Sequence, residues 1–177
     1  MSYLNIISPT TNNDNGYIKN LITYSKYYPY KRKNIISFKS TIGNVFSLQN
    51  TELSVDDKFS LGGRWLRGFD RFGVGPRESN SSYIGGKNII AAKFDFNRPI
   101  LGTSDNPIDL NLFTDIGTVF GNEVDPTYAK ESIRASYGFG IKFYSLLGPI
   151  GLSWGFPLLK EDHDIGRMFT FNIGLLN

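Results

Sequence analysis

The chain has 177 residues, of which 40% are hydrophobic, 15% aromatic and 20% charged, and its formal net charge is +3; this length is enough for one domain with a sizeable core. The chain has no cysteine, which excludes disulfides and thiolate metal sites, and it has no run of about 18 apolar residues such as a transmembrane helix needs. The basic residues look scattered along the sequence, so charge gives no case for binding nucleic acid.

The first third of the chain predicts strands, because helical periodicity is almost absent. Residues 3–8 read as a strand, and a turn rich in Asn and Thr is expected over residues 10–16. Two longer strands are predicted over residues 17–30 and 34–48, where Lys and Ser interleave with apolar and aromatic residues.

From residue 90 onward, apolar and polar residues alternate with a period of two. Residues 90–97 have an apolar face made by Ile90, Ala92, Phe94 and Phe96 and a polar face made by Lys93, Asp95 and Asn97. The same alternation recurs over residues 110–120, 133–143, 150–156 and 169–175. We therefore predict an all-β, antiparallel fold of about eight strands.

The lengths of the strands and links favour a membrane barrel. Several segments run to about ten residues, as a tilted transmembrane strand requires, whereas globular strands are mostly about five or six residues long. Short turns near residues 101–107 and 147–149 alternate with longer polar links at 121–130 and 62–86. This pattern indicates a transmembrane β-barrel segment with its apolar face toward lipid and its polar face toward the lumen.

Five short motifs follow one another between residues 59 and 174. The first, FSLGGRWLRGF at 59–69, ends in a hydrophobic-Arg-Gly-aromatic sequence formed by Leu66, Arg67, Gly68 and Phe69. The others are GG at 85–86 with KFDF at 93–96, LFTDIGTVF at 112–120, LGPIG at 147–151 and FTFNIG at 169–174. In order and spacing, they resemble the motifs of BamA-like outer-membrane protein assembly factors, the bacterial surface antigen superfamily.

The resemblance implies that the chain is the C-terminal half of a sixteen-stranded outer-membrane barrel. Residues 1–177 would then be barrel strands alone, without the family's periplasmic POTRA domains. In the family, the loop with the Arg-Gly motif, here 62–86, folds back into the lumen, where its arginine meets acidic residues of the inner wall. Carried onto this sequence, Arg67 pairs with Asp95 and Asp115. The alternation independently places both aspartates on the polar face, and a confined guanidinium needs carboxylate partners.

The resemblance also implies a function, which is the insertion and assembly of outer-membrane proteins in the bacterial outer membrane. The partners would be unfolded outer-membrane proteins, outer-membrane lipids and unspecified lipoproteins of an assembly complex. A nascent strand cannot leave its backbone groups unpaired in lipid, and in the family the seam between the first and last strands offers a pairing edge. One side of that seam would be formed here by Phe169, Phe171, Ile173 and Gly174.

Three alternatives remain open. The chain could belong to a translocation or secretion pore of the same superfamily, of the TamA-like or two-partner type. It could also be a small closed eight-stranded barrel acting as a structural protein or adhesin, or a soluble β-sandwich that binds a partner. Residues 1–5 do not resemble a signal peptide, so we expect either a fragment of a longer protein or a protein outside the outer membrane.

No catalytic constellation is expected, and neither a cofactor nor a metal. Gly138 and Gly140 lie inside a predicted strand rather than before a helix, which argues against a dinucleotide site. His163 is the only histidine and stands in a polar turn with acidic neighbours, where we expect it to be solvated. The sequence has no G-x-S-x-G motif of the kind that presents a nucleophilic serine. We therefore expect a protein that is not an enzyme.

Overall fold

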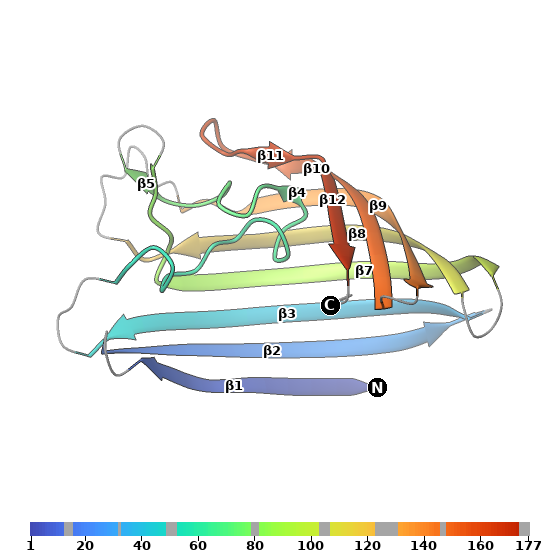
Figure 1. The fold of residues 1–177 in the computed structure, drawn as a ribbon, viewed down its shortest axis with the longest axis horizontal. Coiled ribbons are helices and arrows are strands. Elements are labelled where there is room, and N and C mark those ends of the chain that lie inside the picture. Colours follow the sequence, from blue (N-terminus) through green and yellow to red (C-terminus); the bar gives the residue numbers. More distant parts are fainter. Residues whose placement is uncertain are drawn as a thin grey trace.

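A computed structural model describes residues 1–12, 16–31, 33–48, 53–78, 82–102, 107–122, 131–145 and 148–173. The strands are β1 (Ser2–Asn12), β2 (Tyr17–Tyr30), β3 (Asn34–Ser47), β4 (Gly68–Phe69), β5 (Arg77–Glu78), β6 (Ser82–Tyr83), β7 (Asn88–Gly102), β8 (Pro107–Phe120), β9 (Arg134–Ser145), β10 (Gly148–Leu159), β11 (Gly166–Arg167) and β12 (Phe169–Ile173). Eight of them form one antiparallel sheet in the order β1-β2-β3-β7-β8-β9-β10-β12 (Figure 1). This confirms the predicted all-β, antiparallel fold.

The predicted strand positions are close to the observed ones, but strands extend into the expected turns. β7 (Asn88–Gly102) enters the turn expected at 101–107, and β10 (Gly148–Leu159) begins inside the one expected at 147–149. The turn expected over residues 10–16 begins later, because β1 continues to Asn12. Thr10 and Thr11 pair with Lys19 and Ile18 of β2, after a register shift that follows Ile7. Pro9 lies in that shift, where a residue without a backbone N–H is tolerated. Across the described residues, no helix is long and apolar enough to cross a membrane.

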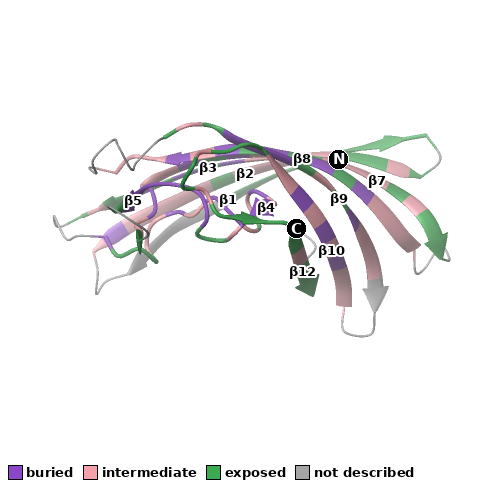
Figure 2. Ribbon diagram, turned by 90° about the horizontal axis from the view of Figure 1, so that it is seen from above, coloured by how far each residue is buried: buried purple, intermediate pink, exposed green. Residues whose placement is uncertain are grey.

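The sheet is arched, and its two faces are chemically opposite. Figure 2 shows the long strands curving over a concave side on which the segment with β4 lies. On the convex side, Phe94 of β7 is 49% exposed and Leu112 of β8 is similarly exposed. On the concave side, the carboxylate residue Asp115 is 0% exposed. A polar inside with an apolar outside is the pattern of a membrane barrel, and a soluble sandwich would show the reverse.

The long connection between β3 and β7 covers the concave face. Its side chains Leu61, Leu66 and Val74 are fully buried, and they pack in one cluster with Ile89 of β7 and Val119 of β8. A backbone bridge between Phe59 and Gly86 closes the base of the connection. The connection is thus a packed part of the fold, because it buries apolar side chains against an otherwise polar trough.

The connection from β10 to β12 also turns inward. Its strand β11 pairs with β4, so that Gly166 lies opposite Phe69. The N–H of Asp70 donates to the carbonyl of Ile165 at 2.9 Å, and the N–H of Ile165 donates to the carbonyl of Gly73 at 2.9 Å. Strand β12 then pairs with only the first part of β10, from Ile150↔Ile173 to Trp154↔Phe169.

The loop reaches the wall most closely at two glycines. A Cβ atom added to Gly155 of β10 would lie 2.6 Å from the backbone nitrogen of Gly68 and 2.8 Å from its Cα. These are backbone atoms, so they cannot rotate away as a flexible side chain would. Gly155 is therefore the residue that lets β4 lie directly on β10.

We expect Gly155→Ala to lift the loop tip from the wall, at a cost of about 1–3 kcal/mol typical of overpacking. Gly166→Ala is the matched control, because its added Cβ would lie 3.6 Å from the carbonyl oxygen of Gly68 and 3.7 Å from Cγ of Pro157, which is ordinary contact. The measurement is the rate of trypsin cleavage after Arg67 in the folded protein. Equal rates for the two variants would contradict the proposed close contact.

Candidate functional site

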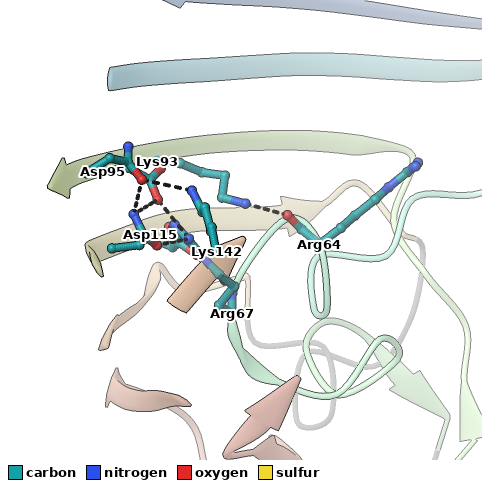
Figure 3. Close-up of polar contacts among 8 residues, drawn as sticks. Arg64, Arg67, Lys93, Asp95, Asp115 and Lys142 are labelled. Carbon is teal, nitrogen blue, oxygen red and sulfur yellow. Dashed lines mark hydrogen bonds and ion pairs between the residues drawn. The ribbon is translucent and has the colours of Figure 1, made fainter. Parts of the chain in front are cut away.

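The loop motif places one arginine against the sheet. Leu66 and Phe69 are buried in the apolar cluster of the loop, and they hold the two ends of the motif. Gly68 has a φ of +90°, a left-handed conformation that glycine adopts without strain. The guanidinium of Arg67 lies against β7 and β8, as Figure 3 shows.

Asp115 of β8 is the main partner of Arg67. The Nη2 group donates to Oδ1 of Asp115 at 2.6 Å and Nε donates to Oδ2 at 2.7 Å. The backbone N–H of Arg67 also donates to Oδ2 at 3.0 Å. The carboxylate therefore holds both the side chain and the backbone of the loop tip. A bidentate arginine–carboxylate interaction of this kind fixes the orientation of the guanidinium as well as its position.

A second contact comes from Asp95 on the neighbouring strand β7. The Nη1 group of Arg67 lies 2.8 Å from Oδ1 of Asp95, and the amide of Asn111 donates to the same oxygen at 3.0 Å. The guanidinium carbon lies 3.6 Å from the centre of the Phe113 ring, a cation–π distance. The structure thus brings Arg67 together with both of the aspartates that the sequence assigned to it.

These contacts keep Arg67 charged. Burial alone would lower the pKa of its guanidinium, but the hydrogen bonds and negative charges of Asp115 and Asp95 raise that pKa above its ordinary value. Loss of either carboxylate would leave a buried cation short of partners, which is costly.

Two lysines complete the polar surface around this arginine. Lys93 of β7 donates to the carbonyl of Arg64 in the loop at 2.7 Å, a contact drawn in Figure 3. Lys142 of β9 donates to Oδ1 of Asn97 at 3.0 Å. We call the set Arg67, Lys93, Asp95, Asn111 and Asp115 the loop brace. It joins the loop to two adjacent strands and offers no activated nucleophile.

The predicted seam residues lie at one end of the sheet. Phe169, Phe171 and Ile173 belong to β12 and point to the convex side, where each is about half exposed. Gly174 lies outside the described residues. In the order of the sheet, β12 has β10 as its one hydrogen-bonded neighbour, so its other edge is unpaired among the described residues.

Sequence reasoning missed an ion pair outside the loop brace. Arg134 at the start of β9 and Asp164 of the β10–β12 connection lie 3.0 Å apart between Nε and Oδ2, with side chains only 4% and 3% exposed. Asp164 stands in the sequence among acidic residues of a polar turn, which suggested a solvated segment. The alternation did place Arg134 on the polar face, but its partner comes from a connection whose inward course left no sequence signal. Among the described residues, His, Asp and Glu side chains form no group of three or more that could hold a metal ion.

A sequence model of the Omp85 superfamily domain matches residues 4–176. The BamA outer membrane protein assembly factor of Neorickettsia risticii is 26% identical over 151 residues, which cover 78% of this chain and 19% of that protein. A SAM50-like protein of Schizosaccharomyces pombe is 28% identical over 75% of this chain and 29% of its own length. The chloroplastic outer envelope protein 80 of Arabidopsis thaliana is 31% identical over 71% of this chain and 16% of its own length.

A solved structure shares the fold. The crystal structure of BamA from Haemophilus ducreyi lacking POTRA domains 1–3 superposes with a TM-score of 0.81 and 25% identity, and the match covers 97% of this chain and 37% of that chain. The chain therefore spans less than a third of the length of the three relatives above. The family match covers almost the whole of residues 1–177, and the chain is a BamA-like member of the Omp85 superfamily.

Proposed function

We propose that residues 1–177 form the C-terminal part of a BamA-like barrel that inserts and assembles proteins in the bacterial outer membrane. The family match and the likeness to BamA over 97% of the chain support this role. The partners would be unfolded outer-membrane proteins and outer-membrane lipids, with lipoproteins of an assembly complex still to be identified. The role needs no catalytic residue and no cofactor, since strand pairing supplies the driving force.

The observation that carries the proposal is the unpaired edge of β12. Its described residues, Phe169–Ile173, pair with residues 150–154 of β10, and the opposite edge of the strand has no partner among the described residues. An incoming strand in lipid must pair all its backbone N–H and C=O groups. A free edge supplies hydrogen-bond partners for these groups in register.

The loop brace is proposed to hold this edge in place from inside the barrel. The brace fixes Arg67, the adjacent strand β4 pairs with β11, and β11 leads directly into β12. The position of the loop thus sets where the last strand begins. Of the alternatives, a closed eight-stranded barrel is disfavoured because β1 and β12 lie at opposite ends of the sheet. A secretion pore of the same superfamily would share the brace, so the edge has to be tested directly.

The insertion role predicts that a client strand contacts β12 during assembly. We would replace Phe171 with the photo-crosslinking residue benzoylphenylalanine in the complete protein in cells. Phe94 of β7 is the matched control, because both are convex-side phenylalanines, 52% and 49% exposed, and only Phe171 lies at the sheet edge. Cross-links to unfolded outer-membrane barrels are expected from Phe171 and only background from Phe94.

Equal cross-linking from both positions would indicate nonspecific contact in the membrane and would contradict the edge proposal. Cross-links from the Phe171 position to secreted polypeptides alone would favour the secretion pore. Because Phe171 and Phe94 are similarly exposed, a difference in cross-linking between them would come from the position of Phe171 at the sheet edge.

The loop brace predicts which of two isosteric variants loses more stability. Asp115→Asn removes the charge that binds the side chain and the backbone of Arg67, and we expect it to cost about 3–5 kcal/mol, as for breaking a buried pair. Asp95→Asn removes one contact from a carboxylate that is 14% exposed, so its effect should be smaller. The measurement is the temperature at which the folded barrel loses its compact electrophoretic mobility. A larger loss in Asp95→Asn would refute the assigned hierarchy.

A further inference from the structure

The turn between β2 and β3 carries positive charge, and its residues belong to neither the loop brace nor β12. The first 50 residues contain six basic residues and a single acidic one, Asp14. Lys26, Lys31 and Lys33 lie close together in the sequence, and the β2–β3 hairpin places them at one rim of the sheet, where all three are exposed. This is the rim where the connections are short, since β7 and β8 are joined through residues 103–106 and β9 and β10 through 146–147.

Exposed tyrosines accompany these lysines on the convex face. Tyr28 is 60% exposed and Tyr30 is 44% exposed, and in register they face Ile36 and Asn34 of β3. The Nζ atom of Lys31 lies 5.9 Å from the centre of the Tyr30 ring. Rings with an apolar body and a polar hydroxyl suit the boundary between hydrocarbon and headgroups, and lysine stems can lie along that boundary with their ammonium groups in the polar layer.

The conformation of Lys33 is the second and independent observation. Its φ is +66°, and among the described residues it is the only one other than glycine with a positive φ. It is the last residue of the three-residue loop that joins Tyr30 to Asn34, a position where glycine or asparagine is favoured. A lysine that accepts this backbone strain at an exposed turn points to a use for its charge.

We propose that this turn binds anionic phospholipid headgroups in the leaflet at the short-turn rim, through Lys26, Lys31 and Lys33 with Tyr28 and Tyr30. The proposal rests on the proposed placement in the outer membrane. Lipid fits better than an acidic protein, because Lys26 and Tyr28 lie on the convex face that continues into exposed Ile36 and Phe94. A soluble partner has no access to a face surrounded by hydrocarbon.

The test uses the complete protein extracted in nonionic detergent, with phosphatidylglycerol and phosphatidylcholine as the probes. Native mass spectrometry measures the fraction of barrel that retains each lipid. The variant K31Q/K33N removes two charges and places at position 33 a residue that suits its backbone, so folding should not suffer. One basic residue near an anionic surface contributes about fivefold in affinity, so the double variant should lose roughly 25-fold for phosphatidylglycerol and nothing for phosphatidylcholine.

The matched control is R71Q/K160Q, which removes two exposed basic residues from the rim with the long connections. It should retain phosphatidylglycerol as the unmodified protein does, and high salt should reduce retention by the unmodified protein toward that of K31Q/K33N. Equal retention by both double variants would overturn the proposal. The proposal would also be overturned if K31Q/K33N lost an acidic protein partner while its phosphatidylglycerol retention stayed unchanged.

Two further readings separate this site from the proposed insertion function. If the protein does not sediment with outer membranes, the proposed placement fails and the lipid site fails with it. If it is in the membrane and the Phe171 position gives no client cross-links, yet K31Q/K33N loses phosphatidylglycerol, the lipid site stands and the insertion role fails. A K33G variant provides a check on strain. It should melt at a higher temperature than the unmodified protein in lipid-free detergent and still retain less phosphatidylglycerol.

Discussion

The bond between Arg67 and Asp115 is the constraint on which the rest of this structure depends. A guanidinium inside a barrel must have carboxylate partners, because an unpaired cation there is costly. Asp115 takes three hydrogen bonds from Arg67, one of them from the backbone. The loop tip can therefore occupy one position on the wall, and the glycines at 68 and 155 leave just enough room for it.

The convex and concave faces of the sheet meet different environments. Its convex face exposes isoleucine, leucine and phenylalanine, whereas its concave face buries lysine, asparagine and aspartate. Near one rim the concave face also carries buried apolar residues, among them Ile89 and Val119, and the β3–β7 connection covers them with Leu61, Leu66 and Val74. Further along the trough the surface stays polar, and there the arginine finds its partners.

Two largely buried arginines form the ion pairs that anchor the segments carrying β4 and β11. Arg67 binds the loop to β7 and β8, and the pair of Arg134 with Asp164 holds the β10–β12 connection to β9. Strands β4 and β11 join these two anchored segments. The last described strand thus starts from a fixed point inside the barrel, and its far edge has no partner among the described residues. This combination suits an edge that must stay in place and still accept an incoming strand.

The sequence by itself determined the strand fold and the two faces, because alternation with a period of two assigns every residue of a strand to a face. Asp95 and Asp115 were placed on the polar face for that reason, whereas their pairing with Arg67 was expected from the resemblance to BamA-like proteins and not from the alternation. Only the tertiary structure decided the inward course of residues 160–168 and the pair of Arg134 with Asp164. These features join residues distant in sequence or depend on the path of a connection, and neither a connection's path nor its contacts follow from a local periodicity.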